Sequence, residues 1–283
     1  MPDLSDVEAG QAYVRACRTL LDPASPGDAL TAYYLLTHPV SRSRRFLLRE
    51  VAPGHVVVEP GSAGRLEVEP VGDKSRGQSQ AVLAICDTGP RDHPLVVLRA
   101  VRPELVPDLI LRALPRGLKH YVITQPSYRS ALDGVLTGVG DQMETVLWRP
   151  GPTTRRMAAA LPGAGEAVAC GGGSARLETY TENGRLGRRL VAGGSVVSSA
   201  TILWESDRFA EVGVSTAAAY RRRGYARVVV GTLILSVLDR GLTPLYIADK
   251  RNLPSLALAA SLGLAPTGHE EYACSGSVPA RDL

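Results

Sequence analysis

A short arginine run that ends in glycine is the feature that most constrains the fold of this chain. Residues 221–224, Arg-Arg-Arg-Gly, follow a strand-like segment (210–215) and precede an apolar helical segment (224–239). The first N–H groups of a helix have no partners within the helix, and the helix dipole is positive there, so anions bind at this end. Glycine lets the backbone approach a ligand closely, and guanidinium groups add positive charge. The turn predicts a phosphate or pyrophosphate site.

The helix after this turn has an apolar face and a defined end. Val229, Val230, Leu233 and Val237 recur at helical spacing, and Gly241 suits the left-handed position that closes a helix. For an isolated motif, a solvated arginine loop before a core helix is the simpler interpretation. The anion site therefore needs support from the surrounding sequence.

The wider pattern predicts an α/β protein with two similar halves, each with the order strand, helix, strand, helix, strand. In the first half, we expect helices over 6–21 and after 26–28, near 103 and near 126, with strands over 55–59, 81–86, 95–101, 121–124 and 143–148. In the second half, we expect strands over 175–181, 188–192, 196–203, 210–215, 245–248 and 268–274, with helices over 224–239 and 253–262. The shared order indicates a weak internal repeat.

Glycine and proline mark the expected boundaries. Residues 60–80 are rich in Gly, Ser and charge and predict an exposed hairpin or loop. Residues 151–173 are dominated by Pro, Gly and Ala, and we expect a linker there with room for a short helix or strand. The expected domains are therefore an N-terminal α/β domain (1–150) and a catalytic domain (174–283).

Composition excludes several classes of protein. The chain has 283 residues, 45% of them hydrophobic, and no apolar run long enough to span a bilayer. The acidic N-terminus lacks the apolar core of a secretion signal, so we expect a soluble protein. Four cysteines lie far apart without a C-x-x-C pair, which favours reduced thiols in a cytoplasmic setting, and no metal site is predicted. Only three of 32 basic residues are lysine, which is typical of a bacterial-like base composition.

With its surroundings, the turn resembles the GNAT superfamily of acyl-CoA-dependent N-acyltransferases. The matching pieces are Arg221-x-x-Gly224-x-Ala226, Asn252-x-x-Ser255 at the start of a helix, and Leu262-Gly263-Leu264 at its end, where the family commonly has Leu-Gly-Phe. A finer pattern is similar to the branch that includes zwittermicin-type resistance acetyltransferases, through Val197-Ser198, the segment 210–216, Tyr220-Arg221 and Tyr272. The resemblance covers residues 175–274.

This resemblance implies a mixed-sheet GNAT fold in the C-terminal half, with the N-terminal half as a degenerate GNAT-like repeat. Strands 210–215 and 245–248 would splay apart to admit the pantetheine arm of acetyl-CoA. The implied cofactor-binding residues are Val214, Thr216, Arg221, Arg222, Arg223, Gly224, Tyr225, Ala226, Asn252 and Ser255. Asn252 is equally typical of a helix cap before Leu253-Pro254, and the two roles are compatible.

The implied activity is transfer of an acetyl group to a primary amine of a small molecule, by direct attack on the thioester. Glu211 is the candidate base, because related enzymes often carry a catalytic Glu on this strand; the alternative is a surface Glu on an alternating strand. Glu205 and Asp207 are weaker candidates because a turn is expected around them. Many family members use a Tyr to protonate the thiolate, but this chain has Ala259 at that position.

The missing tyrosine leaves the proton donor open. Tyr246 and Tyr272 are the nearest candidates, and the alternative is that the thiolate leaves without help, since it is a good leaving group near neutral pH. Three other functions stay in view. They are acylation of a protein or peptide amine by the same fold, a retired CoA-binding module, and nucleic-acid binding, which the absence of interleaved aromatics disfavours.

In the first half, no glycine-rich turn follows the strand that corresponds to 210–215. The sequence there is Val101-Arg102-Pro103-Glu104, so we expect no second cofactor site. The N-terminal half is expected to shape the substrate pocket or to mediate homodimerisation. No membrane partner is expected.

Overall fold

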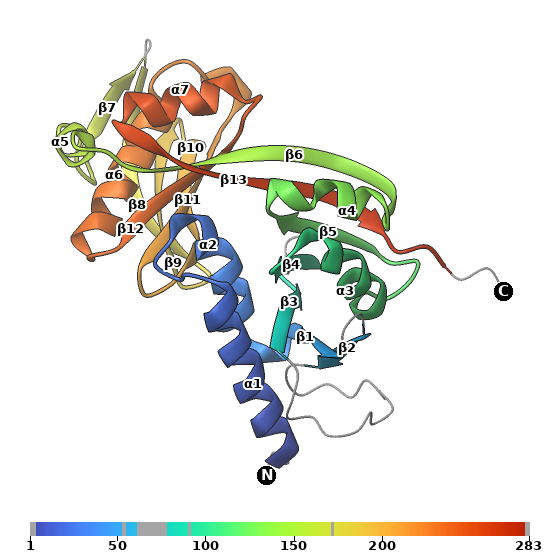
Figure 1. The fold of residues 1–283 in the computed structure, drawn as a ribbon. Helices are drawn as coiled ribbons and strands as arrows, with labels where there is room; N and C mark the ends of the chain where they lie inside the picture. The colour runs from blue at the N-terminus through green and yellow to red at the C-terminus, as the bar shows by residue number, and fades with distance from the viewer. Residues whose placement is uncertain (1–3, 53–54, 61–77, 90–91, 171–172, 281–283) are drawn as a thin grey trace. The chain divides into compact units, whose positions relative to one another are not determined.

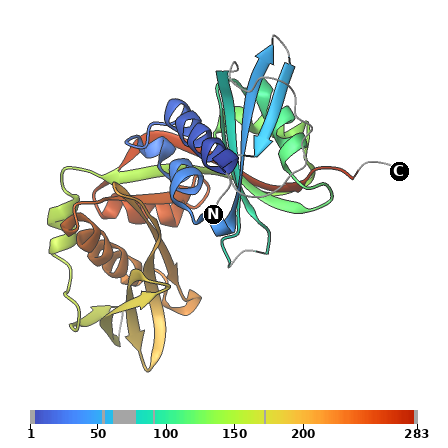
Figure 2. The same cartoon turned by 90° about the horizontal axis from the view of Figure 1, so that it is seen from below.

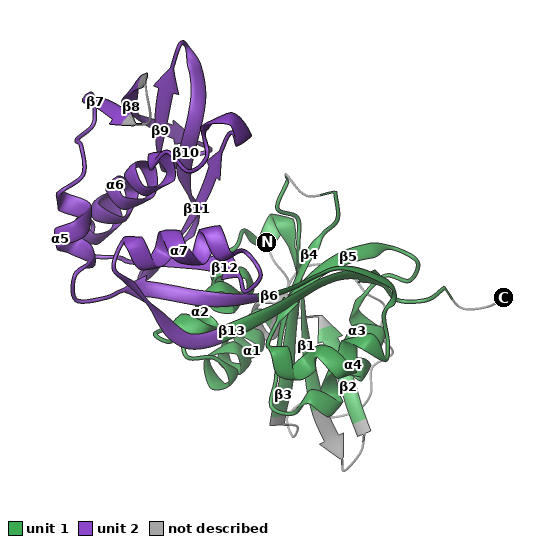
Figure 3. Ribbon diagram, turned by 90° about the horizontal axis from the view of Figure 1, so that it is seen from above, with its two compact units in different colours: residues 1–144, 270–283 green, residues 145–269 purple. Residues whose placement is uncertain are grey.

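The structure is a computed structural model that describes residues 4–52, 55–60, 78–89, 92–170 and 173–280. The chain forms two compact units (Figures 1 and 3). Unit 1 comprises residues 1–144 and 270–283, and unit 2 comprises residues 145–269. None of the described helices is long and apolar enough to cross a membrane.

Unit 1 is a mixed sheet with helices on both faces. Its helices are α1 (Leu4–Leu20), α2 (Pro26–Ala32), the π-helical turn η1 (Tyr33–Thr37), α3 (Val106–Ala113) and α4 (Arg129–Asp133). Its strands run in the order β2 (His55–Pro60), β1 (Ser43–Ala52), β3 (Gln78–Cys86), β4 (Leu95–Ala100), β5 (Lys119–Thr124) and the end of β13 (Leu264–Ser277). Short 3-10 turns lie at Val40–Arg42, Pro103–Leu105 and Pro126–Tyr128.

Alternating side chains of β3 and β4 divide the core of unit 1 into two layers. Leu83 and Leu98 face α3 and α4, whereas Val82 and Val97 pack with α1 and η1. Figure 2 shows α1 in dark blue against this sheet. Every residue of β4 is buried, as expected for a strand that helices cover on both faces.

Unit 2 has its core on one face of its sheet. Its strands run in the order β6 (Thr137–Pro150), β12 (Thr243–Asp249), β11 (Phe209–Thr216), β10 (Ser195–Glu205), β9 (Arg185–Ala192), β8 (Gly173–Glu182) and β7 (Ala167–Cys170). Its helices are α5 (Thr154–Ala159), the 3-10 turn Ala218–Tyr220, α6 (Tyr225–Asp239) and α7 (Leu253–Ser261). The buried side of α6 packs on β9, β10 and β11, and α7 joins the same core through Ala259 and Leu262.

The two units repeat one arrangement of strands. In unit 1, β4 and β5 pair in parallel over three residues, from Leu95↔Tyr121 to Val97↔Ile123, with α3 between them in the chain. In unit 2, β11 and β12 pair in parallel over three residues, from Phe209↔Thr243 to Glu211↔Leu245, with α6 between them. This correspondence confirms the predicted repeat of strand, helix and strand in an α/β fold.

The long strands β6 and β13 each belong to both units. Residues 145–148 of β6 pair with β12, and residues 272–277 of β13 pair with β5, both antiparallel. The sheet of unit 1 is therefore completed by one end of β13, and the sheet of unit 2 by one end of β6. This differs from the expected division at 1–150 and 174–283, which follows chain order.

Most expected elements are present. The structure adds β1, which the sequence analysis missed because its apolar residues (Phe46, Leu47 and Leu48) do not alternate with polar ones. Residues 151–170 hold α5 and β7, so the expected linker contains regular structure within unit 2. Most of the expected hairpin or loop over 60–80 lies outside the described residues.

The pairing of β5 with the end of β13 leads to a prediction about a shortened chain. A chain that ends at residue 150 lacks the β13 segment that pairs with β5, so an unpaired strand edge remains. We expect this fragment to aggregate, as measured by size-exclusion chromatography and circular dichroism. As a control, fusing residues 264–280 to the fragment through a flexible linker should restore a folded monomer. A folded, monomeric fragment 1–150 would contradict the prediction.

Candidate functional site

The candidate site begins where β11 and β12 diverge. Their parallel pairing ends at Glu211↔Leu245, whereas β12 continues from Tyr246 to Asp249 paired with β6 along its opposite edge. Residues 212–216 of β11 keep β10 on one side. On the other side, the neighbouring strand has turned away, so this edge is open to a ligand.

Backbone groups of Val214 and Thr216 face the open edge. The Ala217 N–H donates to the Val197 carbonyl at 3.0 Å, and in an antiparallel pair such bonds recur at every second residue. Residues 212, 214 and 216 therefore direct their N–H and C=O groups away from β10. The Thr216 carbonyl accepts a hydrogen bond from Arg221 Nε at 3.1 Å on that side, whereas its hydroxyl lies 2.8 Å from Ser198 Oγ.

The arginine-glycine turn opens α6 in a conformation that requires glycine. Gly224 is the N-cap residue, with φ of +82°, and Arg222 also has a positive φ of +62°. No side chain of the described residues caps this helix start. A Cβ added at position 224 would meet no described atom within 4 Å. The first-turn N–H groups of Tyr225 and Ala226 are therefore presented at the helix start, where an anion is favoured.

The three arginines of the turn have different surroundings. All three are exposed. Arg221 is bonded to the end of β11, and the Arg223 guanidinium lies 5.5 Å from the centre of the Tyr220 ring. Arg221 thus fixes the turn to the strand, and the three charges together make this helix start positive.

The start of α7 brings together three polar side chains. Asn252 is the N-cap, and its side chain accepts from the Ser255 N–H at 3.2 Å. Ser255 Oγ lies 2.6 Å from the hydroxyl of Tyr246, the first β12 residue beyond the divergence. Burial raises the pKa of Tyr246, so its hydroxyl stays protonated at neutral pH. The expected cap role of Asn252 is thereby confirmed.

Glu211 is the last β11 residue paired with β12, and a tryptophan holds its carboxylate. The indole Nε1–H of Trp204, on β10, donates to Glu211 Oε2. The two residues are register partners beside a bulge between Ile202 and Trp204. Trp204 is 1% exposed and Glu211 is half-buried. Glu211 lies on the face opposite α6, because its neighbours Ala210 and Val212 pack in the α6 core.

The remaining acidic and tyrosine candidates lie elsewhere. Glu205 forms an ion pair with Arg240, and Asp207 lies in the bend between β10 and β11. Ala259 is fully buried in the core of unit 2. Tyr272 lies in the core of unit 1, opposite Thr124 of β5, and burial raises its pKa to about 12. Among the described residues, no group of His, Cys, Asp or Glu is arranged to hold a metal.

Trp204 is a residue that the sequence analysis missed. No motif surrounds it, and a tryptophan on an alternating strand is typical of any core. Its contact with Glu211 depends on the bulge between Ile202 and Trp204, which shifts the register of β10 against β11. A bulge of this kind has no clear pattern in the sequence.

Comparison with known proteins matches this region to one family. Residues 175–273 match the family model described as GNAT acetyltransferase. A search of curated protein sequences found no match.

Two solved structures resemble the whole chain. The GCN5-related N-acetyltransferase from Sphaerobacter thermophilus is 12% identical, with a TM-score of 0.54, and the match covers 100% of this chain and 96% of that one. The tandem GNAT protein from the clavulanic acid biosynthesis pathway is 13% identical, with a TM-score of 0.53, and the match covers 99% and 97%. At these identities the likeness shows the fold, including a GNAT-like repeat in the N-terminal part.

The cap at Asn252 makes a prediction about stability. Replacing Asn252 with Ala removes the acceptor for the Ser255 N–H and should destabilise the protein by about 1 kcal/mol, measured as a lower midpoint of thermal unfolding. Asn252→Asp is the matched control, because aspartate is an equally good cap and should keep the wild-type midpoint. Equal midpoints for Asn252→Ala and wild type would contradict the cap.

Proposed function

We propose that this protein is an acyltransferase that uses acyl-CoA and that it transfers the acetyl group of acetyl-CoA to a primary amine of a small molecule. The match of residues 175–273 to the GNAT acetyltransferase family supports the reaction class. The observation that carries this proposal is the position of Glu211. Its carboxylate lies at the end of the β11–β12 pairing, next to the open edge of β11, and is held there by Trp204. A small-molecule acceptor rests on the resemblance to the resistance acetyltransferases.

The open edge and the helix start fit the shape of a CoA molecule. Backbone amide and carbonyl groups of Val214 and Thr216 suit the two amides of a pantetheine arm, and the first turn of α6 suits the pyrophosphate. The proposed binding residues are those that the resemblance implies, with Tyr225 and Ala226 acting through backbone N–H groups. Arg221, Arg222 and Arg223 add charge around the phosphates, and Asn252 and Ser255 line the side formed by α7.

We assign Glu211 as the general base of the reaction. Acetyl-CoA supplies a thioester whose carbonyl carbon is open to attack. A primary amine is protonated at neutral pH, so it must lose a proton before or while it attacks, and the Glu211 carboxylate accepts that proton directly or through a water. The Trp204 N–H donates to this carboxylate and so fixes its position at the end of the β11–β12 pairing. The new C–N bond then replaces the C–S bond.

We assign Tyr246 as the proton donor for the departing thiolate. Its hydroxyl lies at the divergence of the strands and is protonated at neutral pH, and Ser255 fixes its position. Ser255 can also donate to the phenol oxygen and so assist the transfer. Tyr272 is the weaker candidate because it pairs with Thr124 of β5 in unit 1 and does not lie on the strands that diverge in unit 2. Three buried free thiols, Cys17, Cys86 and Cys274, suit the reducing cytoplasm that we propose as the setting.

The first test is binding of acetyl-CoA, measured by calorimetry. In Gly224→Glu, the new side chain adds a negative charge at the anion site and strains a backbone with φ of +82°, so we expect no measurable binding. Gly241→Glu is the matched control, because Gly241 follows the other end of α6 with φ of +77° and equally open space. It should cost similar stability and keep the affinity. Equal affinities for both variants would contradict the cofactor site.

The second test concerns the base and its positioning residue. Trp204→Phe removes the N–H donor but keeps most of the packing, so the carboxylate should lose its fixed position. We expect kcat with an accepted amine to fall about tenfold, which corresponds to the loss of one hydrogen bond. Affinity for acetyl-CoA should stay unchanged.

Trp148→Phe is the matched control for that test. Trp148 is a second tryptophan of unit 2, partly buried, and its Nε1–H makes no hydrogen bond with the described residues. Its kcat should equal that of wild type. An equal loss of kcat in both variants, or a loss in neither, would show that Trp204 does not act through Glu211.

A further inference from the structure

In unit 1, as in unit 2, the first of the two parallel strands continues beyond their pairing. The pairing of β4 with β5 stops at Val97, and β4 continues to Ala100. In unit 2 the pairing of β11 with β12 stops at Glu211, and β11 continues past Val214. By register, Val97 is the counterpart of Glu211. Ala100, three residues further along, is therefore the counterpart of Val214.

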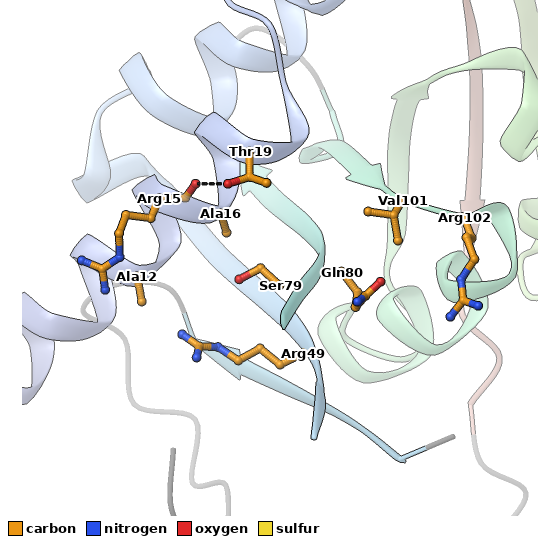
Figure 4. A pocket seen from close by; sticks show the side chains of 9 residues that line it. All are labelled: Ala12, Arg15, Ala16, Thr19, Arg49, Ser79, Gln80, Val101 and Arg102. Carbon is orange, nitrogen blue, oxygen red and sulfur yellow. Dashed lines mark hydrogen bonds between the residues drawn. The ribbon is translucent and has the colours of Figure 1, made fainter. Parts of the chain in front are cut away.

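The backbone of Ala100 directs its polar groups as the backbone of Val214 does. The next N–H group along the chain, that of Val101, donates to the Gln80 carbonyl of β3 at 2.9 Å. Gln80 and Val101 also line a cavity beside α1, to which Arg49 contributes (Figure 4). Bonds between antiparallel strands recur at every second residue, so the Ala100 N–H and C=O point away from β3. They face the side on which the pairing with β5 has ended.

A tyrosine side chain occupies this edge of β4. The Tyr128 hydroxyl donates to the Ala100 carbonyl at 2.7 Å and accepts from the Ala100 N–H at 3.1 Å. Tyr128 is 2% exposed and belongs to the core that includes Leu98 and Val122. One buried hydroxyl thus satisfies both backbone groups, which would otherwise need a strand or a ligand.

Tyr128 reaches β4 from the segment that corresponds to the start of α7. It ends the 3-10 turn Pro126–Tyr128, which follows β5 and precedes α4. In unit 2, the segment after β12 begins α7 and carries Ser255, whose hydroxyl is bonded to Tyr246 of β12. The corresponding segments therefore contact different strands, β4 in unit 1 and β12 in unit 2.

We propose that Tyr128 is a built-in substitute for a ligand in unit 1, and that its phenol takes the place on β4 that an amide of acetyl-CoA takes on β11. A hydroxyl donates and accepts hydrogen bonds, as a secondary amide does, so it satisfies the same pair of backbone groups. Tyr128 thereby blocks this edge to a second cofactor, and the chain holds one cofactor site, in unit 2. The comparison with acetyl-CoA rests on the function proposed above.

The first experiment removes the side chain from the full-length protein. Tyr128→Ala should leave a phenol-shaped space with the Ala100 N–H and C=O at its end. By calorimetry, p-cresol, which has the structure of the tyrosine side chain, should bind this variant about tenfold more tightly than toluene. Only p-cresol can restore both hydrogen bonds. Wild type should bind neither probe.

Leu109→Ala is the matched control for the probes. Leu109 is fully buried in the same core, so its truncation creates an apolar space. Toluene should bind Leu109→Ala at least as tightly as p-cresol does. The proposal is overturned if the two probes bind Tyr128→Ala equally, or if Leu109→Ala shows the same preference for p-cresol.

Tyr128→Phe is a milder variant that keeps the ring and tests the hydroxyl alone. The buried Ala100 groups would lose their partner, so the midpoint of thermal unfolding should fall by about 5 °C. Tyr13→Phe is its control, because Tyr13 is fully buried in unit 1 and its hydroxyl donates a long hydrogen bond, 3.4 Å, to the Leu83 carbonyl. Its midpoint should fall less than half as much, and equal falls would contradict the role of Tyr128.

The stoichiometry of acetyl-CoA binding separates this inference from the proposed function. Wild type should bind one equivalent, and two equivalents would overturn the block in unit 1. If wild type binds no acetyl-CoA, the function proposed for unit 2 fails, and the preference of Tyr128→Ala for p-cresol still decides whether Tyr128 fills a ligand-shaped place on β4.

Discussion

The divergence of β11 and β12 is the constraint on which the site in unit 2 depends. Parallel strands normally satisfy each other's backbone groups along their length, but here the pairing stops at Glu211↔Leu245. Beyond that point β12 is paired with β6 along its opposite edge, from Tyr246↔Trp148 to Asp249↔Thr145, and β11 is paired with β10. The edges of β11 and β12 that faced each other therefore have no strand partner among the described residues, and the open edge at Val214 and Thr216 is the result.

The polar groups around this divergence are fixed by short local contacts. The Arg221 guanidinium donates a hydrogen bond to the Thr216 carbonyl. The hydroxyls of Ser255 and Tyr246 are hydrogen-bonded to each other, and the Trp204 indole N–H donates a hydrogen bond to the Glu211 carboxylate. The first contact joins the turn before α6 to β11, the second joins the start of α7 to β12, and the third joins β10 to β11. This preorganisation places the proposed base and proton donor at the divergence before any ligand arrives.

The two units share one arrangement of strands but differ at the positions of the candidate site. Both have a parallel pair of three residues followed by divergence, and both complete the sheet with part of a shared long strand. Unit 2 has Glu211 and a left-handed glycine at the helix start, and unit 1 has buried Val97 and a proline turn at the same places. At these two positions unit 1 therefore has no counterpart of the proposed base or of the glycine turn.

The sequence by itself determined the α/β class, most of the elements and the glycine turn at the start of α6, because these depend on local periodicity and on a backbone conformation that only glycine adopts easily. It also determined that Ala259 stands where a proton donor is common. It did not determine the partner strands of β5 and β12, since pairing between distant segments leaves no local pattern. It likewise missed β1, the bulge that brings Trp204 to Glu211, and the cavity beside Arg49. Only the tertiary structure decides these, because each depends on which surfaces meet when distant segments pack.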